Sequence, residues 1–486
     1  MGKTLTKIRL LLELLIWGCI SLIPLINTAV VDPIFFLLAL YFILVPDRWS
    51  IIWDNRLFLI LMGQYPLWNM LRLYLTPPHD LEIISSPAKY EMWVYSLVAI
   101  LFATIFFAKS GVKKYAPFFL PISLIGVFFA AGYHYHALGI HKVKLWNANV
   151  FEASLFASSL SFILFGLTQK NLLKSVPYTV AITAPALVIS IAYTGTRGIF
   201  IAQCATILVG LLAFIYRKDY YLALGLVSAT LIGLSFGLWI DASSSGSFSS
   251  RLQIVWALLL EHRIMVLAAL LGAGIATSAV YYTLKALGSR AAIVLMITTF
   301  LVLGTAFKLR DIFENKLHNT TLSPMASQES DNVVSEQSNG ILKNSIDIAN
   351  SQDISTAYRL EFLRHGLEAL KGHVALGRGA YMEPHVVHSF TRDHKHLHNN
   401  YLSWMIWGGL LTMVSGLIWL AAPTVVHQLK SNKEQSIAAL LLAVLWAVSL
   451  LFDSFLTWKN FNAFYILYAC LAHQSFMPNY RADKTS

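Results

Sequence analysis

The chain has 486 residues, of which 57% are hydrophobic and 13% charged, and its formal net charge is +11. Soluble proteins carry about 25% charged residues, so this composition excludes a soluble globular protein. Repeated apolar runs near 20 residues predict instead an all-α polytopic integral membrane protein. Many basic residues flank those runs, as membrane topology requires, which argues against nucleic acid as a partner.

Taken in chain order, the apolar runs predict about 12–14 transmembrane helices. The predicted spans lie near residues 8–28, 33–46, 57–75, 90–108, 116–134, 149–167, 177–194, 199–216, 220–240, 264–283, 291–307, 401–421, 436–452 and 461–475. The first has a basic start but no clean cleavage site, so we expect it to stay uncleaved. The second and the last are short, which is typical of re-entrant or strongly buried segments.

The charges of the connecting loops predict an orientation. With the N-terminus in the cytoplasm, the inside loops carry 18 Lys and Arg residues and the short outside loops carry seven. This asymmetry follows the positive-inside rule, so we expect both termini in the cytoplasm. The chain then divides into residues 1–307 with transmembrane helices 1–11, a large external loop at 308–400, and C-terminal transmembrane helices at 401–486.

The large loop has two parts of different character. Residues 309–355 hold seven acids against three bases and few aromatics, which predicts a flexible linker. In residues 356–400 an amphipathic helix comes first, lying along the membrane interface or over the spans, and a His-rich loop follows. The leucines at helical spacing are Leu360, Leu363, Leu367 and Leu370.

A shorter segment, residues 247–263, opens with the same Ser-x-x-x-Arg-Leu pattern as the segment from Ser355. It contains Arg251, a candidate for a second cation on the outer face. Chance similarity between two amphipathic helices is the alternative.

Two arginines are candidates for binding an anion. Arg197 stands between two spans in the sequence TGTRG, where Gly195 and Gly198 allow the backbone to come close to a ligand. Arg359 is expected in the first turn of the outer helix, where the dipole favours anions and a cation beside free amides forms a phosphate site. Interfacial snorkelling for Arg197 and a solvated surface position for Arg359 are the alternatives.

The histidines in DHKHLHNN are candidates for proton transfer. His398 immediately precedes the span that begins near Tyr401, and imidazole titrates near working pH, so His398 is the best candidate for a general base. Asn399 is placed to orient it, and Asp453, in an outer loop, is placed to face the same cavity. A zinc site at 394, 396 and 398 is the alternative, although the spacing matches no usual zinc signature and the three cysteines lie in apolar runs.

These features together resemble the O-antigen ligase (WaaL) family, within the O-antigen ligase/polymerase superfamily. The resemblance rests on the many spans, on TGTRG at the outer face, and on a large late outer loop. Within that loop, YRLEFLRHGLEAL is followed by HLHN and a Gly-containing span. The layout covers the whole chain, whereas the motifs cover only about 60 residues. Family ligases usually show about 12 spans, and the glycine spacing after the histidine departs from the family pattern.

The resemblance implies a glycosyltransferase of the GT-C-like class in the inner membrane of a Gram-negative bacterium, with its large loop in the periplasm. The donor would be an undecaprenyl-diphosphate-linked O-antigen glycan and the acceptor a sugar hydroxyl of lipid A–core, both presented among membrane lipids. The transfer would invert the anomeric centre and need neither metal nor cofactor.

By resemblance, His398 is the base, Arg197 and Arg359 bind the diphosphate with help from Arg251, and His396 and Asn399 orient the acceptor. The alternatives are an O-antigen polymerase, a protein O-oligosaccharyltransferase and, from a different class, a lipid-linked glycan transporter. A transporter would place its charges near mid-membrane in broken helices, whereas these charges gather at one face.

Overall fold

The computed structural model divides the chain into two compact units, one of residues 1–249 with 349–486 and the other of residues 250–348. The residues that it describes are 2–26, 31–76, 87–138, 150–168, 176–217, 220–243, 354–379, 382–388, 396–429, 437–453, 456 and 459–474. All of these belong to the first unit. The predicted spans 264–283 and 291–307, the predicted linker and Arg251 lie outside them.

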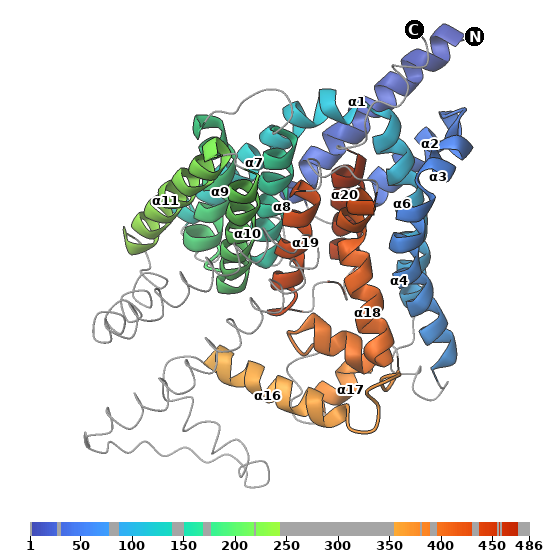
Figure 1. The fold of residues 1–486 in the computed structure, drawn as a ribbon, viewed down its shortest axis with the longest axis vertical. Coiled ribbons are helices and arrows are strands. Elements are labelled where there is room, and N and C mark those ends of the chain that lie inside the picture. The colour runs from blue at the N-terminus through green and yellow to red at the C-terminus, as the bar shows by residue number, and fades with distance from the viewer. Residues whose placement is uncertain are drawn as a thin grey trace. The chain divides into compact units, whose positions relative to one another are not determined.

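The first unit is a helical bundle, and its described residues contain no strand (Figure 1). Its elements are α1 (Gly2–Ile26), α2 (Val31–Leu44), α3 (Arg48–Asp54), α4 (Arg56–Leu75), α6 (Pro87–Lys109), α7 (Val112–His136), α8 (Val150–Thr168), α9 (Val176–Val188), the π-helix η2 (Ile189–Tyr193), α10 (Arg197–Tyr216), α11 (Tyr220–Ser243), α16 (Ile354–Ala369), α17 (Glu383–His388), α18 (Asn400–Leu429), α19 (Ile437–Ser449) and α20 (Lys459–Gln474). The all-α membrane class predicted from composition is confirmed.

The predicted spans within the described residues each coincide with a helix, except that 177–194 covers α9 and η2 together. Four described helices are long and apolar enough to cross a membrane by themselves, namely α6, α7, α10 and α18. A fifth candidate is the pair Asp32–Leu44 and Arg48–Asp54, which is bent by 107°, as in a broken or re-entrant span. Shorter apolar helical stretches lie at Ala153–Phe165, Ala181–Tyr193, Gly225–Asp241 and Ile437–Ser449. The total of 12–14 spans stays a prediction.

Helix α18 packs along α4 through side-chain hydrogen bonds as well as apolar contacts. The indole Nε1 of Trp404 donates to the hydroxyl of Tyr65 at 2.6 Å, and Nε2 of Gln64 donates to the carbonyl of Ser415 at 2.7 Å. Where a membrane replaces water, polar contacts between helices and close packing hold them together, because apolar burial alone no longer distinguishes helix from lipid. These hydrogen bonds therefore fix α18 to α4.

Helix α18 is broken at Gly408 and Gly409, which the sequence did not predict. Gly409 has φ +67° and ψ −155°, a conformation that L side chains rarely adopt. The loop after α16 occupies the break: Leu410 N donates to the carbonyl of Val374 at 2.9 Å, and Arg378 N donates to that of Ile406 at 2.7 Å. Since a membrane protein must satisfy every backbone group internally, this exchange fixes the loop to α18.

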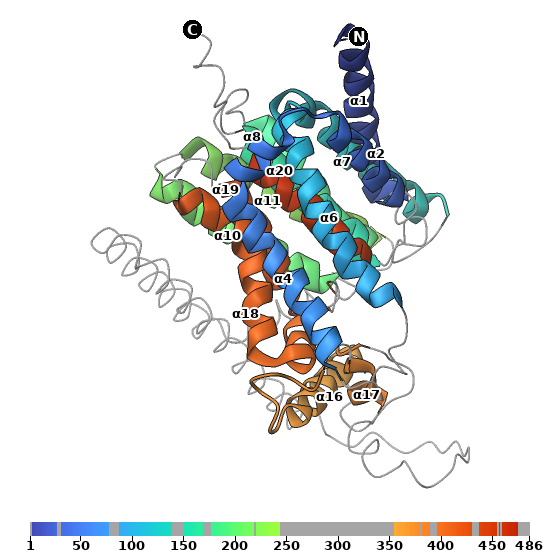
Figure 2. The ribbon, with the colours of Figure 1, turned by 90° about the vertical axis from the view of Figure 1, so that its right-hand side faces the viewer.

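Helices α16 and α17 lie at the end of the unit where α4 ends and α18 begins, and the start of α1 lies at the opposite end (Figure 1, Figure 2). The predicted outer helix is present as α16, and of the leucines at helical spacing Leu370 is buried. Phe362, Gly366 and Leu370 face the bundle, whereas Leu363 and Leu367 are 40% and 55% exposed. An added Cβ on Gly366 would lie 2.3 Å from Leu402 Cδ2, so this glycine sets the close approach of α16 to α18.

Candidate functional site

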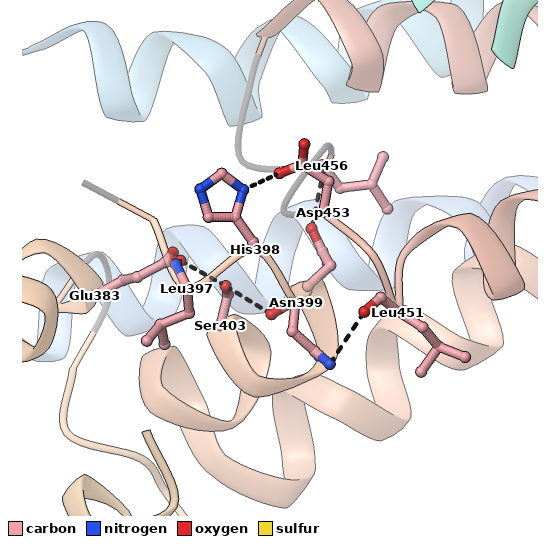
Figure 3. A network of polar contacts seen from close by, with 9 residues as sticks. Glu383, Leu397, His398, Asn399, Ser403, Leu451, Asp453 and Leu456 are labelled. Atoms are coloured by element: carbon pink, nitrogen blue, oxygen red, sulfur yellow. Dashed lines mark hydrogen bonds and ion pairs between the residues drawn. The ribbon is translucent and has the colours of Figure 1, made fainter. Parts of the chain in front are cut away.

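His398 lies at the entrance to α18 and is held there by an unusual backbone. Its φ of +50° makes it the one non-glycine residue with positive φ among the described residues. Such a conformation costs free energy and persists only where neighbouring contacts enforce it. Its Nδ1 lies 3.1 Å from Oδ1 of Asp453, with the two side chains 31% and 13% exposed (Figure 3).

The Asp453 contact selects one ring tautomer. An ionised carboxylate only accepts hydrogen bonds, so Nδ1 carries the proton and the neutral ring keeps its lone pair on Nε2. A third group that orients a base in this way is the usual arrangement in proton-transfer sites. The contact with Asp453 therefore fixes the orientation of the His398 ring as well as its tautomer.

Three hydrogen bonds fix the Asp453 segment to the start of α18. Asn400 N donates to the carbonyl of Leu450 at 2.9 Å, and Leu456 N donates to Asn400 Oδ1 at 3.1 Å. Asn399 Nδ2 donates to the carbonyl of Leu451 at 3.4 Å (Figure 3). The His398–Asp453 pair thus rests on two segments that are tied together on both sides of Asp453.

Asn399 has a structural role that the sequence did not predict. Its Oδ1 accepts a hydrogen bond from Leu402 N at 3.0 Å, the contact of an N-cap residue, while its amide donates to the carbonyl of Leu451. Both polar ends of this side chain thus support the fold around His398. Whether Asn399 also orients an acceptor stays a prediction.

A buried carboxylate that sequence reasoning missed anchors the other side of His398. Glu383, at the start of α17 and only 2% exposed, accepts hydrogen bonds from Leu397 N at 2.6 Å and from Ser403 Oγ at 2.9 Å. These two residues flank His398 in the chain, so one carboxylate holds both sides of it (Figure 3). In the sequence, Glu383 is an acidic residue in a polar loop, and no motif or spacing distinguishes it from a solvated glutamate.

Helix α16 brings Arg359 to the same region. The ring of Phe362 lies 5.6 Å from that of His398, centroid to centroid, and Arg359 precedes Phe362 by three residues. The expected place of Arg359 in the first turn is wrong, because α16 begins at Ile354 and Arg359 stands in its second turn. The free amides of the first turn therefore give no support to Arg359 as an anion ligand. Its position three residues before Phe362, which contacts His398, does give support.

Arg197 begins α10, directly after the π-helix η2 and Gly195, whose φ is +60°. Its neighbour Gly198 packs against Phe452, whose Cβ would lie 2.6 Å from an added Cβ. Phe452 precedes Asp453, so the TGTRG turn reaches the segment that orients His398. The side chain of Arg197 itself is exposed.

Below this turn, three buried hydroxyls form a cluster, with Ser154 Oγ 2.6 Å from Thr194 Oγ1 and 2.9 Å from Thr196 Oγ1. The two threonines of TGTRG are therefore internal anchors of the turn. The sequence pattern placed them beside Arg197 without showing this role.

The remaining predicted residues are placed only in part. His396 is half-buried, two residues before His398, whereas His394 and Arg251 lie outside the described residues. The structure as described contains no group of three His, Cys, Asp or Glu side chains that could hold a metal ion.

Comparison with known proteins gives one match. Residues 248–417 fit the family model described as O-Antigen ligase, roughly a third of the chain. This region includes Arg251, Arg359, Glu383 and His398, while Arg197 and Asp453 stand outside it. A search of curated proteins finds no match.

Proposed function

We propose that the chain is an O-antigen ligase, a membrane glycosyltransferase acting on a lipid-linked glycan. The match of residues 248–417 to the O-antigen ligase family model supports this proposal. The donor is a glycan on undecaprenyl diphosphate, and the acceptor is a sugar hydroxyl of lipid A–core. The observation that supports this function best is the His398–Asp453 pair, in which a carboxylate orients an imidazole ring beside Phe362 of α16.

The reaction assigns each group a role. The acceptor hydroxyl loses its proton to Nε2 of His398 as its oxygen attacks the anomeric carbon of the donor. The bond from that carbon to the diphosphate oxygen breaks, and its electron pair leaves with the lipid diphosphate. A single displacement of this kind inverts the anomeric centre. His396 is proposed to orient the acceptor beside His398.

The leaving diphosphate gathers negative charge, which Arg197 and Arg359 are proposed to stabilise. Guanidinium groups match phosphate oxygens with two parallel hydrogen bonds and supply the charge that metal-using enzymes take from a cation. Arg251 is proposed as a third contributor on the basis of its sequence pattern alone. We place these groups on the periplasmic side of a Gram-negative inner membrane, since α16 and the start of α1 lie at opposite ends of the unit and loop charges favour a cytoplasmic N-terminus.

We expect Arg197→Lys and Arg359→Lys each to lower transfer at least about tenfold, because a lysine is a point charge without the planar fork. Both purified proteins should remain folded, and both should bind the donor less tightly. Arg364→Lys on the solvent-facing side of α16 is the matched control and should transfer normally. Wild-type turnover in both test variants would reduce the two arginines to interfacial anchors.

The reaction class is tested on lipopolysaccharide from a strain that lacks the protein. Loss of all attached O-chain, with lipid-linked polymer accumulating, supports a ligase. Single-repeat O-chain still attached to lipid A–core would identify a polymerase, unchanged lipopolysaccharide with unglycosylated proteins a protein O-oligosaccharyltransferase, and donor trapped on the cytoplasmic side a transporter. Transfer by purified protein should persist in EDTA, since the proposed chemistry uses arginines and no divalent ion.

A further inference from the structure

A cavity of about 310 Å³ lies between α16, the loop that follows it and α17. Its lining includes His365 and Glu368 from α16, Arg378 from the loop and His385 from α17. None of these side chains has a part in the proposed transfer. Their hydrogen-bonding groups indicate which class of ligand the cavity recognises.

The cavity presents hydrogen-bond donors without protein partners. Arg378 Nε donates to the carbonyl of Ala369 at 2.6 Å, whereas its two terminal nitrogens have no partner among the described residues. Nε2 of His385 is buried and likewise has none there. Buried polar atoms nearly always find partners, so Nε2 of His385 is suited to a ligand that brings an acceptor oxygen. Arg378 is exposed, so its guanidinium is accessible to the same ligand.

Helix α16 adds a hydrogen-bond acceptor to the cavity, the exposed carboxylate of Glu368. His365 lies between two carboxylates, with Nδ1 3.9 Å from Glu368 Oε2 and Nε2 3.5 Å from Glu361 Oε2. A carboxylate binds the hydroxyl groups of a sugar, while a guanidinium binds its phosphate or carboxylate substituents. A carboxylate together with a guanidinium fits a glycan that carries an anionic group better than it fits an apolar ligand or a bare diphosphate.

The position of the cavity along α16 distinguishes between the donor glycan and the acceptor glycolipid as its ligand. At 1.5 Å rise per residue, Phe362 lies about 4.5 Å and Ala369 about 15 Å beyond Arg359 along the helix axis. Phe362 contacts His398, and Ala369 lines the cavity. The proposed diphosphate contact, the base and the cavity thus follow one another along one helix.

In an inverting displacement, the nucleophile and the leaving group lie on opposite sides of the reacting carbon. The cavity lies farther along α16 than His398 does, on the side away from Arg359 and the proposed diphosphate. It therefore belongs to the acceptor side of the reaction. We propose that the cavity lined by His365, Glu368, Arg378 and His385 binds an anionic sugar of the acceptor glycolipid and so delivers the neighbouring hydroxyl to His398. This inference rests on the proposed ligase function and adds its acceptor subsite.

The first test compares Arg378→Gln with Lys371→Gln. Both remove one positive charge from the loop that follows α16, but Lys371 does not line the cavity. With purified lipid A–core as acceptor, Arg378→Gln should raise the acceptor KM about tenfold or more, the loss of one charge-assisted contact, at unchanged donor KM. Lys371→Gln should match wild type. An unchanged acceptor KM in a folded Arg378→Gln protein would overturn the proposal, and a raised donor KM would assign the cavity to the donor glycan.

A second variant separates binding from folding. His385→Leu removes a buried nitrogen that has no partner among the described residues, so thermal stability should hold or rise. Acceptor KM should nevertheless increase, whereas His373→Leu on the exposed loop should change neither quantity. Equal acceptor KM values for His385→Leu and wild type would contradict a role for this ring in binding.

The source of the negative charge is tested with modified acceptors. Lipid A–core stripped of phosphate with aqueous hydrofluoric acid, and separately carboxyl-reduced lipid A–core, are compared with the native glycolipid in a binding assay. Wild type should bind one of the two modified acceptors about tenfold more weakly than it binds the native acceptor. Arg378→Gln should bind that modified acceptor and the native acceptor equally well, because the contact is already lost. Equal wild-type binding of all three would overturn the inference alone, whereas no transfer by wild type to any acceptor would overturn the ligase function itself.

Discussion

His398→Ala should lower glycan transfer to lipid A–core by about 10²–10⁴, the usual contribution of a positioned general base. The loss follows from removing the imidazole that Asp453 orients and whose Nε2 is proposed to take the acceptor proton. Donor binding should survive, because Arg197 and Arg359 remain. The measurement is the initial rate of transfer alongside donor binding for the same purified protein.

The neighbouring histidines serve as controls for that result. His394→Ala should stay within about a few-fold of wild type, since a base must lie within hydrogen-bond reach of the acceptor hydroxyl. His396→Ala should act on acceptor KM more than on kcat if it orients the acceptor. Normal transfer by His398→Ala together with an inactive His396→Ala protein would show that the base is assigned to the wrong histidine.

The helical framework could be predicted well from sequence because apolar runs long enough to span a bilayer rarely occur outside membrane proteins. The outer helix was also predictable from its leucine spacing, but the burial of Phe362 and Gly366 was not. Phe362 and Gly366 face α18 because Gly366 allows close packing there, and that preference depends on Leu402, which is remote in sequence. The spacing of apolar residues predicts that a helix has an apolar side, but it does not predict the shape of the helix that packs against it.

The contacts that hold His398 were harder to predict for a related reason. Asp453 was expected near the outer face, but its pairing with Nδ1 depends on hydrogen bonds from Asn399 and Asn400 to a segment some 50 residues later in the chain. Glu383 gave no signal, because a buried and a solvated glutamate look alike in sequence. The break at Gly408 and Gly409 was hidden inside an apolar run for which two glycines are unremarkable.

The second large effect is expected for Asp453→Asn, which should lower kcat by about 10² or more while leaving donor binding and acceptor KM nearly unchanged. An asparagine keeps the size of the side chain but loses the charge that stabilises the imidazolium formed when His398 accepts a proton, and its amide can favour the wrong tautomer. Asp453→Glu should recover part of the rate, because its carboxylate can still face Nδ1.

The decisive measurement is the double variant His398→Ala/Asp453→Asn. Asp453 is proposed to act only through His398, so removing both should cost no more in kcat than His398→Ala alone, since residues that act as a unit are strongly non-additive. A merely structural aspartate would instead add its own loss to that of the histidine. Fully multiplicative losses, or an Asp453→Asn protein with the kcat of wild type, would show that the 3.1 Å contact between Asp453 and Nδ1 does not serve proton transfer.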